Sequence, residues 1–213
     1  MRYRPQHKSI TRNRIVNTAS ELFRGRSIDG VGVSDLMNRA GLTHGGFYAH
    51  FSSKEALAAE AIKVAFDEAW QRRKQVVGEA APGRKFLTAI EHYLTTTHRD
   101  NSAKGCIAAA LASEVAHHPG PIRDAMTAGV KRWIAGVEQM IEEDGLDVDA
   151  HTAIATMVGA MVLSRAMADP ALADKFIISV RETLLSPPPR QRPSSVQQRS
   201  KPPPSQRTKR ARS

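Results

Sequence analysis

The chain has 213 residues, of which 41% are hydrophobic and 24% charged, so most of it is expected to fold and an intrinsically disordered protein is excluded. Its net charge of +10 favours a polyanionic partner, either nucleic acid or an anionic membrane surface, or else a solubilising tail. A single cysteine, Cys106, excludes an internal disulfide and a Cys-rich zinc site.

The distribution of apolar and charged residues along the chain narrows the possible partners and the cellular location. The N-terminus lacks a signal-peptide run, and the longest apolar run, 153–163, is too short to span a bilayer, so we expect a soluble cytoplasmic protein. Residues 1–54 hold nine Lys/Arg against three acids, residues 55–185 hold fourteen against eighteen, and residues 186–213 hold eight against none. Two basic ends therefore flank an acidic middle.

Three short helices are expected at the N-terminus. Apolar residues at helical spacing predict the first over 9–24, namely Ile15, Ala19, Leu22 and Phe23. A second stripe, Val33, Leu36, Met37 and Ala40, predicts a short helix with Gly41 as its C-cap. Thr43 is expected to N-cap a third helix over 44–50.

The following residues predict a long fourth helix and two shorter ones. Ser52 and Glu55 have the spacing of a capping box, which marks the start of the fourth helix. The Pro82-Gly83 pair ends it, a fifth helix carries Phe86 and Ile90, and a sixth begins near Gly105.

Three more helices complete the prediction. A stripe from Ile122 to Ile141 predicts the seventh, which ends at Asp144-Gly145. The eighth, over 149–167, is apolar on most of its circumference and is therefore expected to be buried on several sides, and Pro170 opens the ninth. No segment alternates apolar and polar residues for long, so we predict an all-α protein of nine helices.

The last segment, 186–213, differs in composition from the rest. It holds seven of the twelve prolines and a single aliphatic residue, Val196. It cannot form a core, and we predict a disordered basic Pro-rich tail.

Three short helices, a basic excess and a glycine-centred turn predict a helix-turn-helix, whose second unit enters the DNA major groove. The runs RIVNTASELF and GVGVSDLMNRAGLTHGGFYAHFSSKEAL resemble the TetR-family signature nearly position by position. The resemblance implies a DNA-binding domain over 1–54 and a helical ligand-binding and dimerisation domain over 55–185. It also implies a repressor that leaves its palindromic operator when an inducer binds.

The resemblance assigns DNA contacts to the third helix and its flanks. Physical chemistry agrees, because helix N-terminal amides favour phosphate, Tyr48 offers a hydroxyl and Lys54 a charge. Phe47 and Phe51 are expected to face the core, and a merely solvated helical face remains the alternative. The candidate DNA-binding residues are Thr43, His44, Gly45, Gly46, Tyr48, His50 and Lys54.

Two residue choices depart from the family pattern. Gly45 and Gly46 each cost about 1 kcal/mol in a helix relative to Ala and present no side chain to a base. Either the backbone approaches DNA closely there, or base reading depends on His44 and few others. Gly32 also replaces the usual hydroxyl N-cap.

Specific DNA binding generally needs a second helix-turn-helix about one turn of DNA away from the first, so we expect a homodimer. Helices eight and nine are the expected four-helix interface, and ordinary intrachain packing is the alternative. The residues proposed for it are Met157, Val158, Ala160, Met161, Ala173, Ile177 and Val180.

The middle helices are expected to enclose a pocket for a small-molecule inducer, although aromatic and Met residues on such stripes also serve as plain core. Glu114 falls on an apolar face and needs a partner, for which Arg123 is preferred over an inducer cation. The candidate ligand-binding residues are His92, Tyr93, Cys106, Glu114, Met126 and Trp133, with Met140 beside them.

Cys106 has a second interpretation. A helix N-terminus and the nearby Lys104, Arg99 and His98 favour a thiolate, although burial in the core is also common for cysteine. The segment resembles that of electrophile-sensing repressors of the family, where a Gly-Cys pair precedes a short helix ending in Glu. Oxidation or alkylation of this thiol is therefore a second hypothesis for DNA release.

An enzyme and an architectural DNA-binding protein are the two alternative classes of function. An enzyme with Cys106 as nucleophile is disfavoured, because the sequence has no His-Glu-x-x-His spacing and no Gly-rich phosphate loop, and neither metal nor cofactor is expected. An architectural DNA-binding protein without an inducer stays open, since Lys209, Arg210 and Arg212 would add non-specific phosphate affinity.

Overall fold

The computed structural model describes residues 5–118 and 120–186, which form nine α-helices and two 3-10 helices and contain no strand. The predicted all-α class is confirmed. The elements are α1 (Pro5–Arg26), α2 (Val33–Arg39), η1 (His44–Ala49), α3 (Lys54–Gly78), α4 (Lys85–Tyr93), α5 (Thr96–Asp100), η2 (Ser102–Lys104), α6 (Ile107–Val115), α7 (Pro121–Glu143), α8 (Ala150–Ala166) and α9 (Pro170–Leu185). The predicted tail, 186–213, lies outside the described residues after Ser186.

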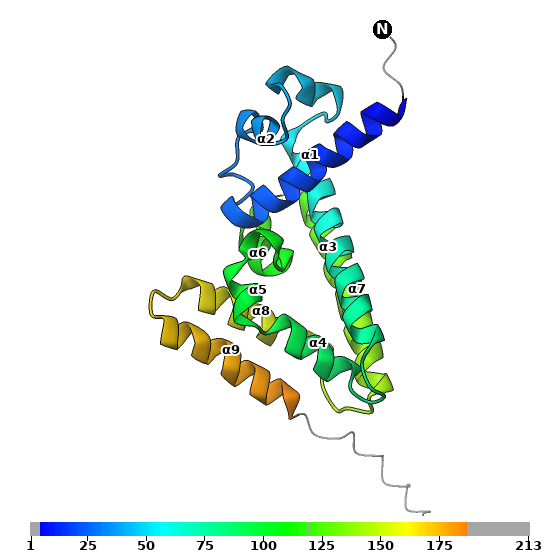
Figure 1. Ribbon diagram of the computed structural model, residues 1–213, viewed down its shortest axis with the longest axis vertical. Coiled ribbons are helices and arrows are strands. Elements are labelled where there is room, and N and C mark those ends of the chain that lie inside the picture. Colours follow the sequence, from blue (N-terminus) through cyan, green and yellow to red (C-terminus); the bar gives the residue numbers. More distant parts are fainter. Residues whose placement is uncertain (1–4, 119, 187–213) are drawn as a thin grey trace, which may run out of the picture.

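The helices form a head and a body, as Figure 1 shows. α1, α2 and η1 make the head at one end of the molecule. α3 leaves the head and runs along α7, its most extensive packing partner, while α8 and α9 pack side by side. α6 lies between the head and the body and contacts α1, α7 and α8.

The head has its own apolar centre, which supports the third element. Phe47 and Phe51 are buried as predicted, with their rings stacked at 5.7 Å. The segment over 44–49 is a 3-10 helix rather than the predicted α-helix, because two successive glycines lower helix propensity. Thr43 occupies the N-cap position, but its side chain makes no capping hydrogen bond, so that part of the prediction was wrong.

The start of α3 also differs in detail from the prediction. The N-cap is Ser53, whose hydroxyl accepts a hydrogen bond from the amide of Ala56 at 3.2 Å. The predicted box of Ser52 with Glu55 is therefore wrong by one residue. The carboxylate of Glu55 instead accepts hydrogen bonds from its own amide and from Ser53, and these lower its pKa.

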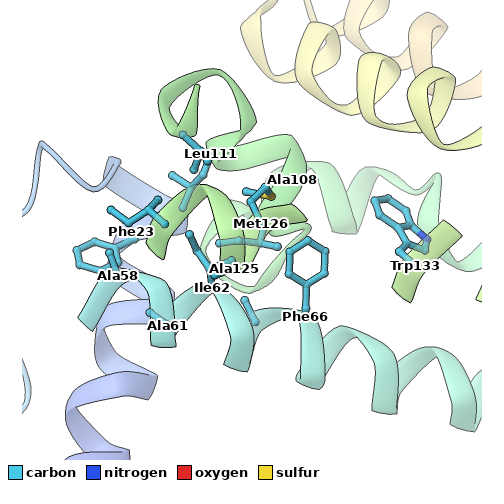
Figure 2. Packing of buried hydrophobic residues seen from close by; sticks show 14 of the residues in the cluster. Phe23, Ala58, Ala61, Ile62, Phe66, Ala108, Leu111, Ala125, Met126 and Trp133 are labelled. Carbon is cyan, nitrogen blue, oxygen red and sulfur yellow. The ribbon is translucent and has the colours of Figure 1, made fainter. Parts of the chain in front are cut away.

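Two glycines on α7 allow α3 to approach closely. A Cβ at Gly129 would lie 2.0 Å from the ring of Phe66, and one at Gly136 would lie 2.6 Å from that of Trp70. The aromatic side chains of α3 therefore fill the spaces where α7 has no side chain. In Figure 2, α1, α3, α6 and α7 meet at Phe23, Ile62, Leu111 and Met126, with Trp133 further along α7 beyond Phe66.

Two short elements between α4 and α6 were missed by sequence analysis. Thr95 N-caps α5 by accepting from the amide of His98 at 3.1 Å, and η2 follows. Three successive threonines are poor helix formers, so no helical pattern was visible. The side chain of Arg165 on α8 holds this segment by donating to the carbonyl oxygens of His98 and Arg99, each at 3.0 Å.

α8 and α9 expose an apolar surface, but the residues on it differ from those predicted for the dimer interface. Of the seven predicted interface residues, Met157, Ala160, Met161, Ala173 and Ile177 are buried inside the chain, where they join the two helices to each other and to the body. The outward-facing large apolar residues are Val162, Leu163, Leu172 and Ile178, each more than 40% exposed. The assignment of these five residues was wrong, because a helix that is apolar on all sides does not reveal which side faces its own core. Val158 and Val180 are only partly buried, and their place in an interface stays a prediction. No helix within 5–118 and 120–186 is both long and apolar enough to cross a membrane.

Candidate functional site

The tip of the head presents polar side chains on a fixed base. Tyr48 is 66% exposed although its neighbour Phe47 is completely buried, and the two rings meet edge to face at 5.2 Å. Nδ1 of His44 lies 2.9 Å from the hydroxyl of Ser34 on α2, which links η1 to the preceding helix. The structure therefore brings Tyr48 and His44 together on one exposed surface.

The remaining candidates for DNA contact surround this tip. Thr43 and Gly45 are exposed, and Lys54 is half-buried at the first turn of α3. A Cβ at Gly45 would meet nothing within 4 Å, and one at Gly46 only ordinary contacts at 3.7 Å and beyond. The fold of the described residues thus does not itself require glycine at either position.

His50 has a different environment from the other candidates. It is half-buried, its Nδ1 has no hydrogen-bond partner in the described part of the chain, and its carbonyl oxygen accepts from Arg12. Burial, reinforced by the charges of Lys8 and Arg12, lowers the pKa of His50. The neutral imidazole is therefore favoured next to a cationic part of α1.

The body contains a cavity of about 450 Å³ between α3, α4, α5, α7 and α8. Four of the six predicted ligand residues line it, namely His92, Tyr93, Cys106 and Trp133, and Met140 lines it too. Met126 is buried in the core near the head instead (Figure 2), and Glu114 also lies away from the cavity wall. Arg73 and His98 line the cavity and were not predicted, because Arg73 belongs to a charged run that resembles a solvated helical face.

His98 positions the backbone at Cys106. The amide of Cys106 donates to Nε2 of His98 at 2.9 Å, and Nδ1 lies 2.7 Å from the carbonyl oxygen of Tyr93. Because Nε2 accepts a hydrogen bond and Nδ1 must donate one to the carbonyl oxygen, the ring is the neutral tautomer with its proton on Nδ1. Burial lowers the pKa of His98, which also favours this form. Since both ring nitrogens are engaged, His98 is not free to act as a base toward the Cys106 thiol.

Comparison with known families gives an identity to both parts of the molecule. Residues 15–61 match the family model "Bacterial regulatory proteins, tetR family", and residues 82–180 match "Tetracyclin repressor-like, C-terminal domain". The two matches together span the head and most of the body.

This chain belongs to the TetR family.

Relatives and solved structures agree with this assignment. The HTH-type transcriptional repressor NemR of Escherichia coli is 28% identical over 134 residues, which cover 62% of this chain and 67% of NemR. The crystal structure of reduced E. coli NemR superposes with a TM-score of 0.68 at 23% identity, covering 81% of this chain and 95% of that one. AibR, solved in complex with isovaleryl coenzyme A and operator DNA, has the same fold, with a TM-score of 0.62 at 19% identity, covering 83% and 99%. As a TetR-family member, the protein is a DNA-binding transcription regulator.

Polar contacts at both ends of the α6 region connect it to the DNA-binding head of this TetR-family protein. Arg24, near the end of α1, has a side chain only 2% exposed, and its Nη1 donates to the carbonyl oxygen of Gly105 at 3.3 Å. Its Nη2 reaches Glu68 on α3 at 3.4 Å. Because Gly105 directly precedes Cys106, one buried side chain joins the cavity wall to α1.

The second contact lies at the other end of α6. The carboxylate of Glu114 accepts hydrogen bonds from the amides of Ile28 and Asp29, at 3.0 and 2.8 Å. Nε2 of His118 is 3.9 Å from the same carboxylate. Arg123 is not the partner of Glu114, so that prediction was wrong. The backbone turn after α1 supplies the donors instead, and a sequence pattern of side chains does not reveal backbone partners.

Proposed function

We propose that this protein is a dimeric repressor that reads operator DNA with η1 and its flanks and leaves the DNA when the cavity is occupied. The observation that carries the DNA-binding part is the exposure of Tyr48 on a tip whose adjacent Phe47 is fully buried. A large aromatic side chain held outward by a rigid base is suited to contact with a partner. Tyr48 and His44 would read or position the duplex, while Thr43 and Lys54 would hold its phosphates.

The absence of steric need for Gly45 and Gly46 supports a close backbone approach to the duplex. Each glycine would be replaceable as far as the described fold is concerned, since a Cβ there meets no close atom. A Cβ would, however, occupy space between η1 and the groove. His50 would act differently from the others, by holding η1 against Arg12 of α1.

The dimer would form through the outward face of α8 and α9. Val162, Leu163, Leu172 and Ile178 are large apolar side chains left exposed on neighbouring helices. Two such helix pairs would bury these side chains as a four-helix bundle and set the spacing of the two heads. We expect Leu163→Glu to shift the dimer toward monomer in sedimentation and to weaken operator binding at least tenfold. Ala135→Glu, on the exposed side of α7, is the control that should change neither.

Control by a ligand follows from the two ends of α6. A molecule in the cavity would contact Cys106 and Ile107, at the start of α6, while Arg24 and Glu114 attach the same segment to the head. Ligand binding would favour a conformation in which the two heads no longer match the half-site spacing.

Modification of Cys106 is a second route to release and rests on its place in the cavity wall. Oxidation or alkylation would add atoms at the contact between His98 and α6. Operator release by an electrophile should then disappear in Cys106→Ser, and equal release in both proteins would exclude this route.

One experiment tests the proposed function as a whole. Sequences bound from a random DNA pool are selected, and the winning site is used in a competition assay with a small-molecule library. We expect a palindrome with half-sites about one DNA turn apart, roughly 34 Å, and at least one compound that lowers affinity. Binding without sequence preference would instead support an architectural DNA-binding protein.

A further inference from the structure

The wall of the cavity is positively charged. Its lining includes the cations Arg72, Arg73 and Lys104 together with two histidines, but no Asp or Glu. Arg72 has an acidic neighbour outside the cavity, with Nη1 3.9 Å from Glu68. The charge of the wall itself is therefore not balanced from within the cavity.

Among these cations, Arg73 indicates most directly which kind of ligand the cavity accepts. Its guanidinium lies over the rings of Trp133, at 5.4 Å, and Trp70, at 5.8 Å, and its Nη1 is buried without a hydrogen-bond acceptor in the described part of the chain. Burial lowers the pKa of Arg73, and no carboxylate is among the groups that act on it. A buried guanidinium donor without an acceptor is costly, so this site favours a ligand that supplies one.

Tyr93 provides a second unsatisfied donor at the same place. Its ring lies 5.7 Å from that of Trp133, so Arg73 and Tyr93 pack around one indole. Its hydroxyl is buried without a hydrogen-bond partner in the described part of the chain. Burial and, after it, the Cys106 thiol raise the pKa of Tyr93. Arg73 and Tyr93 both line the cavity.

The rest of the wall is apolar and suits an uncharged body. A volume of about 450 Å³ is typical of sites for small organic molecules. The apolar lining residues come from five helices and include Phe66, Phe86, Ile90, Ile107, Val137 and Met157.

We propose that the cavity binds an organic carboxylate, whose charged group accepts hydrogen bonds from Arg73 and Tyr93 and whose aryl or alkyl body lies against the apolar wall. A carboxylate matches the planar guanidinium and also accepts from the phenol, so it satisfies both donors at once. A neutral molecule of the same shape would leave the charge of Arg73 uncompensated. This inference deepens the proposed ligand control and depends on it only for the effect on DNA.

Binding to the intact protein tests the carboxylate directly. Titration calorimetry at pH 7.5 would compare 2-naphthoate and nonanoate with 2-naphthamide and nonanamide, which have nearly the same shape but no charge. We expect at least one acid to bind ten times or more as tightly as its amide, since hydrogen bonds between charged partners are the stronger class. Equal affinities, or no binding of either acid at millimolar concentration, would overturn the proposal.

Variants locate the charged group. Arg73→Gln should remove the preference for acid over amide, whereas Lys74→Gln, an exposed neighbour on α3, should retain the preference. Tyr93→Phe should reduce acid binding about threefold to tenfold. If circular dichroism shows that Arg73→Gln does not fold, two other measurements test the carboxylate site. These are acid binding by Tyr93→Phe and the comparison of acids with amides on the wild-type protein. A preference that survives in Arg73→Gln would contradict the assignment.

The same acids, added to the complex with the selected operator, separate the two proposals. Tight acid binding without DNA release would support the carboxylate site and contradict ligand control. Release by uncharged compounds alone, with no preference for acids, would overturn the carboxylate site while leaving ligand control in place.

Discussion

The backbone amide of Ile28 donates a hydrogen bond of 3.0 Å to Oε2 of Glu114, although the two residues are 86 positions apart in the sequence. The adjacent amide of Asp29 donates to Oε1 at 2.8 Å. One carboxylate at the end of α6 thus satisfies two successive amides in the turn between α1 and α2. Oδ1 of Asp29 in the same turn also lies 3.6 Å from Nε2 of His118, just after α6.

Replacing Glu114 should therefore affect both stability and coupling. Glu114→Ala removes the acceptor of two amides and is expected to cost about 1–3 kcal/mol of unfolding free energy. Operator affinity should decrease, because α6 loses one attachment to the head. For the same reason, a ligand should lower the operator affinity of the variant by a smaller factor than that of the wild type. Denaturant unfolding and operator titration with and without ligand measure these effects.

The control for this variant is Glu138→Ala, which removes an exposed acid from α7. Its stability should stay within about 0.5 kcal/mol of wild type. A full ligand response in Glu114→Ala would show that coupling does not pass through this carboxylate.

Gly45→Ala should separate folding from DNA binding. The added Cβ meets nothing within 4 Å, so the free energy of unfolding should be unchanged or higher by up to about 1 kcal/mol, since Ala restricts the unfolded chain more than Gly. Operator affinity should fall at least tenfold if the backbone of η1 lies against the DNA. Thermal unfolding and a gel-shift titration measure the two quantities. Wild-type affinity in this variant would place the duplex away from Gly45.

Lys54→Gln should change the salt dependence of DNA binding. Lys54 is at the first turn of α3, beside η1, where its ammonium would neutralise a phosphate. The slope of log K against log salt should become less steep by about 1 for each phosphate contact that is lost. Affinity for all sequences should decrease about equally, because phosphate contacts carry no sequence information. A changed sequence preference with an unchanged slope would instead assign Lys54 to base contact.

Acidification should loosen the contact between α5 and α6. Because the pKa of His98 is lowered below its ordinary value of 6.5, the unfolded chain binds more protons, and stability rises with pH through this range. The contribution of His98 is complete above pH 6.5 and is lost as pH falls toward its folded pKa. Protonation of Nε2 breaks the hydrogen bond from Cys106, which is worth about 1 kcal/mol, or roughly 2–4 °C in Tm.

Melting curves between pH 7.5 and 5.5 test this expectation. His98→Gln should show a smaller decrease in Tm over this range than wild type. His117→Gln, at an exposed position just after α6, is the matched control and should follow wild type. Identical pH profiles for all three proteins would remove His98 as the titrating group.

The sequence by itself determined the helical class and the position of most long helices. Stripes such as Ile122 to Ile141 repeat at the helical period. Proline marks the starts of α7 and α9, and Gly145 follows the end of α7. It also determined which aromatic residues in η1 and the loop after it face inward, namely Phe47 and Phe51. These features depend on residues close together in the chain, so a local pattern is sufficient to predict them.

Only the tertiary structure decided which residues surround the cavity and which partners satisfy the buried polar groups. Arg73 and Tyr93 belong to α3 and α4, and both line the cavity because both pack on Trp133 of α7. Glu114 and Arg24 bind backbone groups, which every residue possesses and which no side-chain pattern can distinguish. Contacts between distant segments depend on how whole helices pack, and that packing is set by the sum of many apolar contacts rather than by any short run of residues.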